Sequence, residues 1–200
     1  MGRVLPMSFY RRRTVQVAQE LLGHVLIHEL RPGHCVAGRI VETEAYLGNE
    51  DPACHSYNNR RTERTEVMYR AGGFSYVYFI YGMYFCFNVV TEKKDKAEAV
   101  LIRALEPLEG IDKMKKLRRT QNEKILCAGP GRLCQALGID RGLNGLPLHQ
   151  PPLWIEEGIA APQIVAGERI GIAQPEARSW PLRFCLKDSP YVSRRVWGPA

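Results

Sequence analysis

The alternation of apolar and polar positions divides the chain into predicted strands. Two apolar runs, residues 24–30 and 36–47, are separated by the turn residues Arg31-Pro32-Gly33 and predict a pair of strands. Aromatic and β-branched residues fill positions 75–80 and 84–90 on either side of Gly82, which predicts a β-hairpin. Further strands are predicted at residues 99–105, 165–172 and 182–186.

Helical spacing of apolar residues predicts three helices, at residues 14–22, 109–119 and 130–137. We expect Thr14 to cap the first of them and Gly23 to end it. The Gly- and Pro-rich segment 142–162 is expected to be irregular. Because strands and helices are mixed without a strict βαβ alternation, we predict an α+β fold. The expected architecture is a single domain, residues 1–200, with a curved, mainly antiparallel sheet, flanking helices and a protruding β-hairpin.

Charge adds a candidate partner to this picture. The 200 residues include 28 Lys and Arg against 21 Asp and Glu, a formal net charge of +7. A basic balance favours an anionic partner, of which nucleic acid is the commonest. The six cysteines include no CxxC pair, so we expect no zinc site. Neither a signal-type apolar run nor a stretch of about 18 apolar residues is found, so we expect an intracellular protein with no membrane partner.

Two glutamates stand out in the strand predicted at residues 36–47. The two-residue period of a strand places Glu42, Glu44 and Tyr46 on one face. Two carboxylates on one face indicate either a solvated sheet face or the lining of a site. The period alone does not choose between Glu42 and Glu44.

A single arginine, Arg103, interrupts the apolar strand predicted at residues 99–105. An unpaired buried guanidinium is very costly, so Arg103 lies either at a sheet edge or beside a buried carboxylate. Glu42 and Glu44 are the candidate partners. The pair could be purely structural, or it could hold one carboxylate ionised as a general base for water.

The predicted hairpin is the segment with the most aromatic residues. Tyr76 and Tyr78 share a face, and Tyr81 lies at the Gly82 turn, where core residues are unusual. An aromatic side chain at a hairpin tip can wedge into a base stack. Asn88 is polar within an apolar strand and needs a hydrogen-bond partner or a ligand. The alternative is an ordinary hairpin with an aromatic core.

The polar segment 48–64 is predicted to be a long surface loop, and loops of this length usually have a function. Its second half and the residues that follow, 55–65, are basic and rich in hydroxyl groups, which suits contacts with phosphate. A solvated loop without a ligand is the alternative interpretation.

Seven segments lie in order along nearly the whole chain and read GRIVETEAYLG, DPACHS, RRTERTEVMY, YVYFIYGMYFCFNVV, LIRALEPLEG, LCAGPGRLCQALGI and PLRFCLKDSPYVS. Together they resemble the alkyladenine (methylpurine, or 3-methyladenine) DNA glycosylase family. The resemblance implies a monofunctional glycosylase that flips damaged purines out of duplex DNA and hydrolyses the N-glycosidic bond, starting base excision repair. The damaged purines would be of the 3-methyladenine, 7-methylguanine, hypoxanthine and ethenoadenine class.

The resemblance also implies roles for individual residues. Glu44 matches the glutamate that activates water, Arg103 an arginine that helps to hold this water, and Ile170 a position whose carbonyl does the same. Tyr46 and His55 match one wall of the base pocket, and Tyr78 matches the opposite wall.

Other matches concern specificity and DNA binding. Asn88 matches the asparagine that excludes the exocyclic amine of guanine, and Tyr81 the residue that fills the gap left by the flipped base. Positions near the DNA backbone are matched by Arg60, Thr62, Met68 and Arg132. Glu63 and Glu66 add negative charge to this loop, which departs from the expected basic pattern.

From the resemblance we expect a monomer that needs no metal or cofactor and binds duplex DNA containing damaged purines. It would lie with the nucleoid in the cytoplasm of a bacterium or in the nucleus of a eukaryote. Two other functions are compatible with the same residues. One is a non-catalytic protein that binds the minor groove of DNA, and the other is an enzyme acting on free nucleosides.

Overall fold

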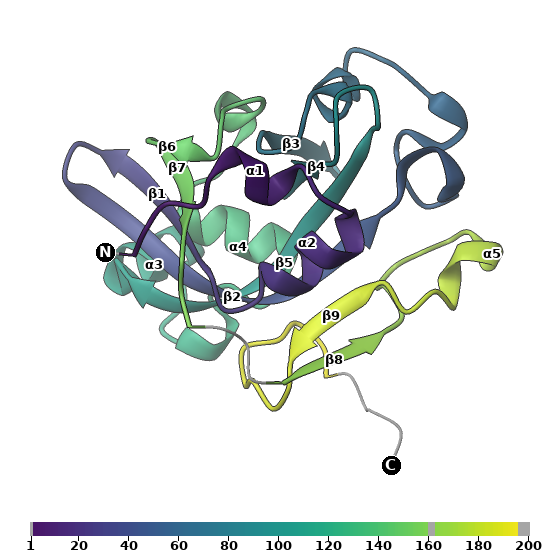
Figure 1. The fold of residues 1–200 in the computed structure, drawn as a ribbon. Helices are drawn as coiled ribbons and strands as arrows, with labels where there is room; N and C mark the ends of the chain where they lie inside the picture. Colours follow the sequence, from purple (N-terminus) through teal and green to yellow (C-terminus); the bar gives the residue numbers. More distant parts are fainter. Residues whose placement is uncertain (1, 160–162, 196–200) are drawn as a thin grey trace.

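A computed structural model describes residues 2–159 and 163–195 of the chain (Figure 1). The helices are α1 (Met7–Tyr10), α2 (Thr14–Glu20), α3 (Ile111–Arg118), α4 (Pro130–Leu137) and α5 (Pro175–Arg178). The strands are β1 (Val25–Arg31), β2 (His34–Tyr46), β3 (Ser75–Ile80), β4 (Tyr84–Thr91), β5 (Glu98–Glu109), β6 (His149–Gln150), β7 (Leu153–Glu156), β8 (Ile164–Gly167) and β9 (Arg183–Leu186). Short 3-10 turns cover Gly48–Glu50, Tyr57–Asn59, Glu66–Tyr69, Glu123–Ile125 and Arg141–Leu143.

A single antiparallel sheet runs through the protein in the order β3-β4-β5-β2-β1-β7-β6. Strand β2 is central in this sheet. It pairs with β5 along nearly the whole length of β2, with β1 through the first half of β2 and with β9 at Glu42–Glu44. Register shifts between Ile40 and Thr43 bend β2 at this change of neighbour. The expected α+β fold with a curved, mainly antiparallel sheet is confirmed.

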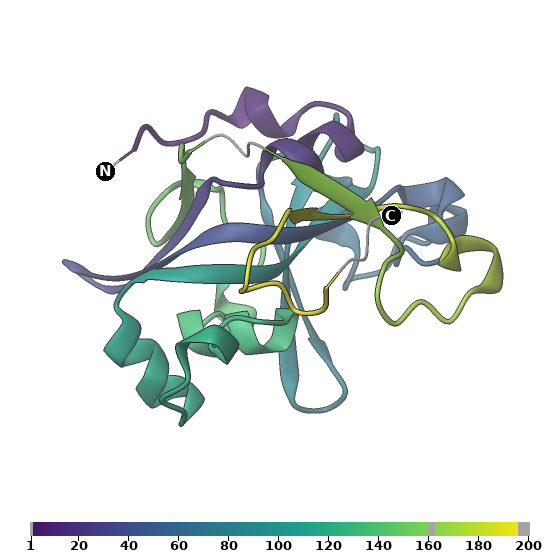
Figure 2. The ribbon, with the colours of Figure 1, turned by 90° about the horizontal axis from the view of Figure 1, so that it is seen from below.

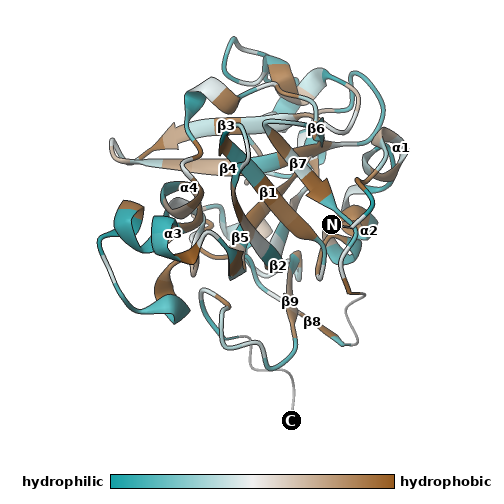
Figure 3. Cartoon of the chain, turned by 90° about the vertical axis from the view of Figure 1, so that its left-hand side faces the viewer, coloured by the Kyte–Doolittle hydropathy of each residue, from teal (hydrophilic) through white to brown (hydrophobic). Residues whose placement is uncertain are grey.

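Helices cover both faces of this sheet, with α1 and α2 on one side and α3 and α4 on the other (Figure 2). Fully buried apolar residues from α2, α4 and the central strands form the main core, among them Val17, Ile40, Phe87, Ile102 and Leu137. The outer helix α3 is largely hydrophilic (Figure 3). The β3–β4 hairpin extends beyond the body of the protein, as expected (Figure 2).

Three local predictions were wrong. Segment 142–162, of which residues 160–162 lie outside the described residues, was expected to be irregular, yet β7 lies within it and pairs with β1, because four residues suffice for a strand that has a sheet to join. The strand predicted at residues 165–172 ends at Gly167, beyond which Arg169 contacts Asp51 in the loop after β2 and Ile170 contacts Glu44 on β2. Thr14 does not cap α2; its hydroxyl lies within hydrogen-bond distance of Thr91 and Glu98.

Within residues 2–159 and 163–195, no helix is both long and apolar enough to span a bilayer.

Candidate active site

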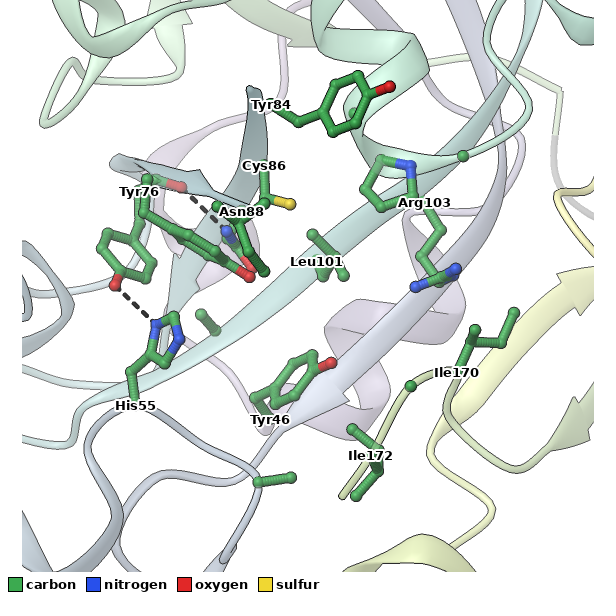
Figure 4. Close-up of a pocket in the computed structure, with 18 of the residues that line it drawn as sticks. Tyr46, His55, Tyr76, Tyr84, Cys86, Asn88, Leu101, Arg103, Ile170 and Ile172 are labelled. Carbon is green, nitrogen blue, oxygen red and sulfur yellow. Dashed lines mark hydrogen bonds between the residues drawn. The ribbon is translucent and has the colours of Figure 1, made fainter. Parts of the chain in front are cut away.

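A cleft of about 580 Å³ opens beside the β3–β4 hairpin (Figure 4). The hairpin and β5 form one side, the loop around His55 and the end of β2 form another, and the N-terminus of α4 and the loop at residues 170–174 complete the rim. Of the residues predicted for the site, its lining includes Tyr46, His55, Met68, Tyr78, Tyr81, Asn88, Arg103, Arg132 and Ile170. The fold therefore brings together residues that are up to 124 positions apart, from Tyr46 to Ile170.

Glu44 lies directly behind the lining of this cleft and is fully buried. Its Oε1 accepts a 2.7 Å hydrogen bond from the backbone N–H of Ile170, and its Oε2 accepts from the Tyr46 hydroxyl at 2.9 Å. Arg103 donates to the same Oε2 at 3.4 Å. A carboxylate has about four acceptor sites, so three donors leave roughly one site for a water molecule.

Burial raises the pKa of Glu44 above the ordinary value of a glutamate, while Arg103, the Ile170 N–H and the Tyr46 hydroxyl act in the opposite direction. Desolvation disfavours the charged form, and the three donors favour it. A carboxylate with a raised pKa accepts a proton more readily than an ordinary one, which suits a general base.

Glu42 is also fully buried, but it faces a different set of partners. Its Oε1 accepts from Arg183 at 3.0 Å, from the Ser193 hydroxyl at 3.0 Å and from Arg103 at 3.3 Å. Its Oε2 accepts from the Ser193 backbone N–H at 2.6 Å. Glu42 thus joins β9 and the segment near the C-terminus to Arg103.

The predicted pairing of Arg103 with a buried carboxylate is confirmed, and it involves both glutamates. The alternative of a solvated sheet face is wrong, because neither carboxylate is exposed. All three donors to Glu44 belong to residues that line the cleft, whereas Arg183 and Ser193, which bind Glu42, do not. Of the two acids, Glu44 is therefore the one whose hydrogen-bond donors all line the cleft.

Aromatic side chains form the inner part of the cleft (Figure 4). His55 Nδ1 lies 2.9 Å from the Tyr76 hydroxyl. Burial, together with the nearby Arg64 and Arg60, lowers the pKa of His55 to about 4, so the imidazole is neutral at pH 7. The His55 and Tyr78 rings meet edge to face with centroids 4.6 Å apart. His55 and Tyr78 are therefore not separated as two opposing walls here, because this contact leaves no room for a base between them.

Asn88 is buried, and its side-chain amide donates a 3.0 Å hydrogen bond to the carbonyl of Tyr76 on the neighbouring strand. The predicted need for a partner is met within the hairpin itself. Because Asn88 also lines the cleft, this bond fixes the amide in one orientation toward any ligand.

The hairpin tip is exposed. Tyr81 has 79% of its surface accessible and Met83 has 64%, whereas Tyr76 and Phe87 nearer the base are buried. Both Tyr81 and Gly82 have positive φ, of 53° and 66°, as the central residues of a type I′ turn do. The interpretation as an ordinary aromatic core hairpin holds for the base of the hairpin and fails for its tip.

The residues predicted near the DNA backbone differ in their exposure to solvent. Arg60, Thr62 and Arg132 are exposed, and Arg132 lies in the first turn of α4 at the rim of the cleft. Met68 is only 1% exposed and packs in a hydrophobic cluster, so its side chain is not on the surface. Its backbone N–H is also occupied, by the carbonyl of Thr65.

Several residues of the site were missed by sequence analysis. Tyr84 lines the cleft and lies against Gly131, where a Cβ atom would come within 2.9 Å of its ring. Asp51 and Arg169 form a buried ion pair next to the site, and Arg183 pairs with Glu42. A lone arginine in an apolar strand led to Arg103, and the same signal was present at Arg183, between Leu182 and Phe184.

No group of three or more potential metal ligands occurs among the residues that the structure describes. The six cysteines are all unpaired.

Comparison with known proteins gives a consistent result. The family model for methylpurine-DNA glycosylase matches residues 8–190. A relative from Desulfitobacterium hafniense is 50% identical over 196 residues, which cover 93% of this chain and 96% of the relative. Relatives from Clostridium novyi (46% identical, 94% and 97% covered) and Prosthecochloris aestuarii (47% identical, 97% and 92% covered) are similar. All three are provisionally named 3-methyladenine DNA glycosylases. The chain therefore belongs to the methylpurine-DNA glycosylase family, a family of DNA-repair hydrolases.

Proposed function

We propose that this protein releases damaged purines from duplex DNA by hydrolysing the N-glycosidic bond, with Glu44 as the general base. The observation that carries the proposal is the environment of Glu44: a buried carboxylate whose three donors all belong to residues lining the cleft. Family membership supports the same reaction class.

A base within a duplex is out of reach of a buried carboxylate, so the nucleotide must rotate into the cleft. Unstacking costs a few kcal/mol, and less for a damaged or mispaired base. Tyr81, exposed at the hairpin tip on the edge of the cleft, would offset part of this cost by filling the vacated stack. The aromatic lining would then stack on the flipped base, worth roughly 1–3 kcal/mol.

In the chemical step, water attacks C1′ of the deoxyribose and forms the new C–O bond. The C1′–N bond breaks, and its electron pair leaves with the base. Glu44 takes the proton of the water, and its negative charge stabilises the positive charge that develops on the sugar. Arg103 and the Ile170 N–H orient the carboxylate. No lysine is found among the described residues that line the cleft, so hydrolysis without a covalent imine is the step that this site supports.

The decisive experiment uses duplex oligonucleotides that each carry one hypoxanthine, ethenoadenine or 3-methyladenine. Base release is revealed by cleaving abasic sites with alkali or heat, and strand cleavage without this treatment is scored separately. Glu106→Gln serves as the matched control, because Glu106 is a half-buried acid that pairs with Arg39 outside the cleft. We expect release by the wild type and by Glu106→Gln, and none by Glu44→Gln.

The outcomes separate the other candidate functions. Lesion binding without release by the wild type would indicate a non-catalytic DNA-binding protein. Cleavage of free nucleosides with no preference for the duplex would indicate a nucleosidase, and the exposed Tyr81 would then have no role.

A further inference from the structure

A buried ion pair joins the two loops that approach Glu44 and Tyr46 from outside the sheet. The side chains of Asp51 and Arg169 are both fully buried. Arg169 Nη2 donates to Asp51 Oδ1 at 2.8 Å, and Nη1 donates to Oδ2, so the pair is bidentate. It links the loop after β2 to the loop after β8, which are 118 positions apart.

On one side, Asp51 organises the loop that carries His55. Its Oδ2 accepts from the backbone N–H of Leu47 and its Oδ1 from that of Ala53, both at 3.0 Å. The Asp51 carbonyl accepts from the N–H of Cys54 at 2.8 Å. One aspartate therefore fixes the start, middle and end of the turn that leads from Tyr46 to His55.

On the other side, Arg169 contacts the wall of the cleft and precedes a donor to Glu44. Its guanidinium lies 4.7 Å from the centroid of the Tyr46 ring and donates to the Ala45 carbonyl at 3.1 Å. The next residue, Ile170, donates its backbone N–H to Glu44. A displacement of Arg169 would therefore be passed on to both Tyr46 and Ile170.

Stability alone is a poor explanation for this pair. Removing two charges from water costs several kcal/mol per ion, and packed apolar residues often replace such pairs without loss. Arg169 Nε is moreover buried without a hydrogen-bond partner, an additional unfavourable contribution to folding. A costly, incompletely bonded pair next to a site suggests a functional role.

We propose that Asp51 and Arg169 are positioning residues: together they hold the Ile170 N–H on Glu44 and the Tyr46 ring at the wall of the cleft. This inference rests on the proposed function of Glu44 as the base, and its structural part can be tested without activity.

The pKa of Glu44 depends on whether the Ile170 N–H is held against its carboxylate. The Ile170 N–H lowers the pKa of Glu44, against the larger effect of burial, so losing this donor should raise the pKa further. The charged and titratable groups around Glu44 are Glu42 and Tyr46 on β2, Cys86 on β4, Arg103 on β5, Arg183 and Cys185 on β9, and Arg169 itself. None of these groups other than Arg169 is changed by the variants below.

The test compares Arg169→Lys and Asp51→Asn with the wild type. Lysine keeps the charge but cannot form the bidentate contact, and asparagine keeps the shape of Asp51 while removing its charge. Met114→Ala is the control, because Met114 is fully buried in α3, away from the cleft, and its truncation lowers Tm without touching either loop. The pKa of Glu44 is read by carboxyl ¹³C NMR, and base release is measured by single-turnover kinetics between pH 5 and 8.

In both positioning variants we expect the pKa of Glu44 to rise by about one pH unit, since a hydrogen bond to a charged group is lost. The acidic limb of the rate profile should move by the same amount, and the plateau rate should fall on the order of 100-fold. Met114→Ala should lower Tm and leave the pKa of Glu44 and the acidic limb of the rate profile unchanged.

Positioning variants with a lower Tm but the wild-type pKa of Glu44 would overturn the inference. A wild type that releases no base, with the NMR shift still present, would refute the proposed function and leave the positioning role intact.

Discussion

The backbone N–H of Ile170 donates a 2.7 Å hydrogen bond to Oε1 of Glu44 across 126 positions of sequence. The resemblance had implied a role for the Ile170 carbonyl, and the structure adds one for its N–H. The contact is possible because the chain leaves the sheet after Gly167 and runs beside the C-terminal end of β2, where Arg169 donates to the Ala45 carbonyl and Ile170 to Glu44. A loop that is distant in sequence thus supplies one of the three donors that orient Glu44.

The two glutamates of β2 should differ in what their loss removes. Glu44→Gln should abolish base release while retaining affinity for lesion duplexes, because the amide cannot accept the proton of water. Glu42→Gln should retain some release but lower stability, since Arg183 and Ser193 lose a charged partner and breaking such a buried pair costs about 3–5 kcal/mol. Single-turnover kinetics and thermal unfolding measure both effects. Loss of chemistry in Glu42→Gln alone would reverse the assignment.

The rate should rise with pH through the pKa of Glu44, because only the ionised carboxylate accepts a proton. Burial raises this pKa above 4.5, so the acidic limb should lie above that of an ordinary glutamate. The folded protein then holds this proton at pH values where the unfolded chain has lost it. The contribution of Glu44 to stability therefore falls as pH rises from 4.5 through the folded pKa. Urea unfolding of the wild type and of Glu44→Gln across this range measures the contribution as the difference between the two slopes, because His55 titrates in both proteins.

Removing the tip tyrosine should affect DNA binding and not folding. Tyr81 is 79% exposed, so Tyr81→Ala should change the free energy of unfolding by less than about 0.5 kcal/mol. Lesion binding should weaken by about 1–3 kcal/mol, the value of one lost stacking contact. Leu108→Ala, at an exposed apolar position outside the cleft, is the control for binding and Tm. A large drop in Tm for Tyr81→Ala would contradict the role of the tip.

Asn88 should limit which purines are released. Asn88→Ser shortens the side chain at the cleft and removes the hydrogen bond to the Tyr76 carbonyl, at a cost of about 1 kcal/mol. If the amide excludes the exocyclic amine of guanine, the variant should release unmodified guanine faster than the wild type does. Base release from undamaged G·C duplexes measures this, with hypoxanthine duplexes as the internal standard. An unchanged ratio of the two rates would argue against discrimination by Asn88.

His55 should remain neutral in mildly acidic solution. Burial and two nearby arginines lower its pKa to about 4, whereas in the unfolded chain histidine titrates near 6.5. Between these values the unfolded state binds the additional proton. The contribution of His55 to stability is therefore fully present above pH 6.5 and is lost as pH falls toward about 4. NMR titration of the imidazole gives the pKa directly, and a midpoint near 6.5 would show that the ring is solvated.

The sequence by itself determined the elements whose patterns are local. Hydrophobic period and turn residues placed α4, the β3–β4 hairpin and most of β2, because side-chain alternation and glycine turns act over a few residues. The charge argument also held at Arg103: a lone arginine in an apolar strand required a buried carboxylate, and it has two.

The strand period does not distinguish Glu42 from Glu44, because both lie on one strand face, and burial does not distinguish them either; the tertiary structure separates them by their hydrogen-bond partners. Their difference lies in partners that come from distant segments, Ile170 for Glu44 and Ser193 for Glu42. The Asp51–Arg169 ion pair also depends on the folded structure, since nothing near Asp51 in the sequence indicates that Arg169 is its partner. Local sequence determines which strand face carries the acids; which acid serves the cleft depends on contacts that exist only once the chain is folded.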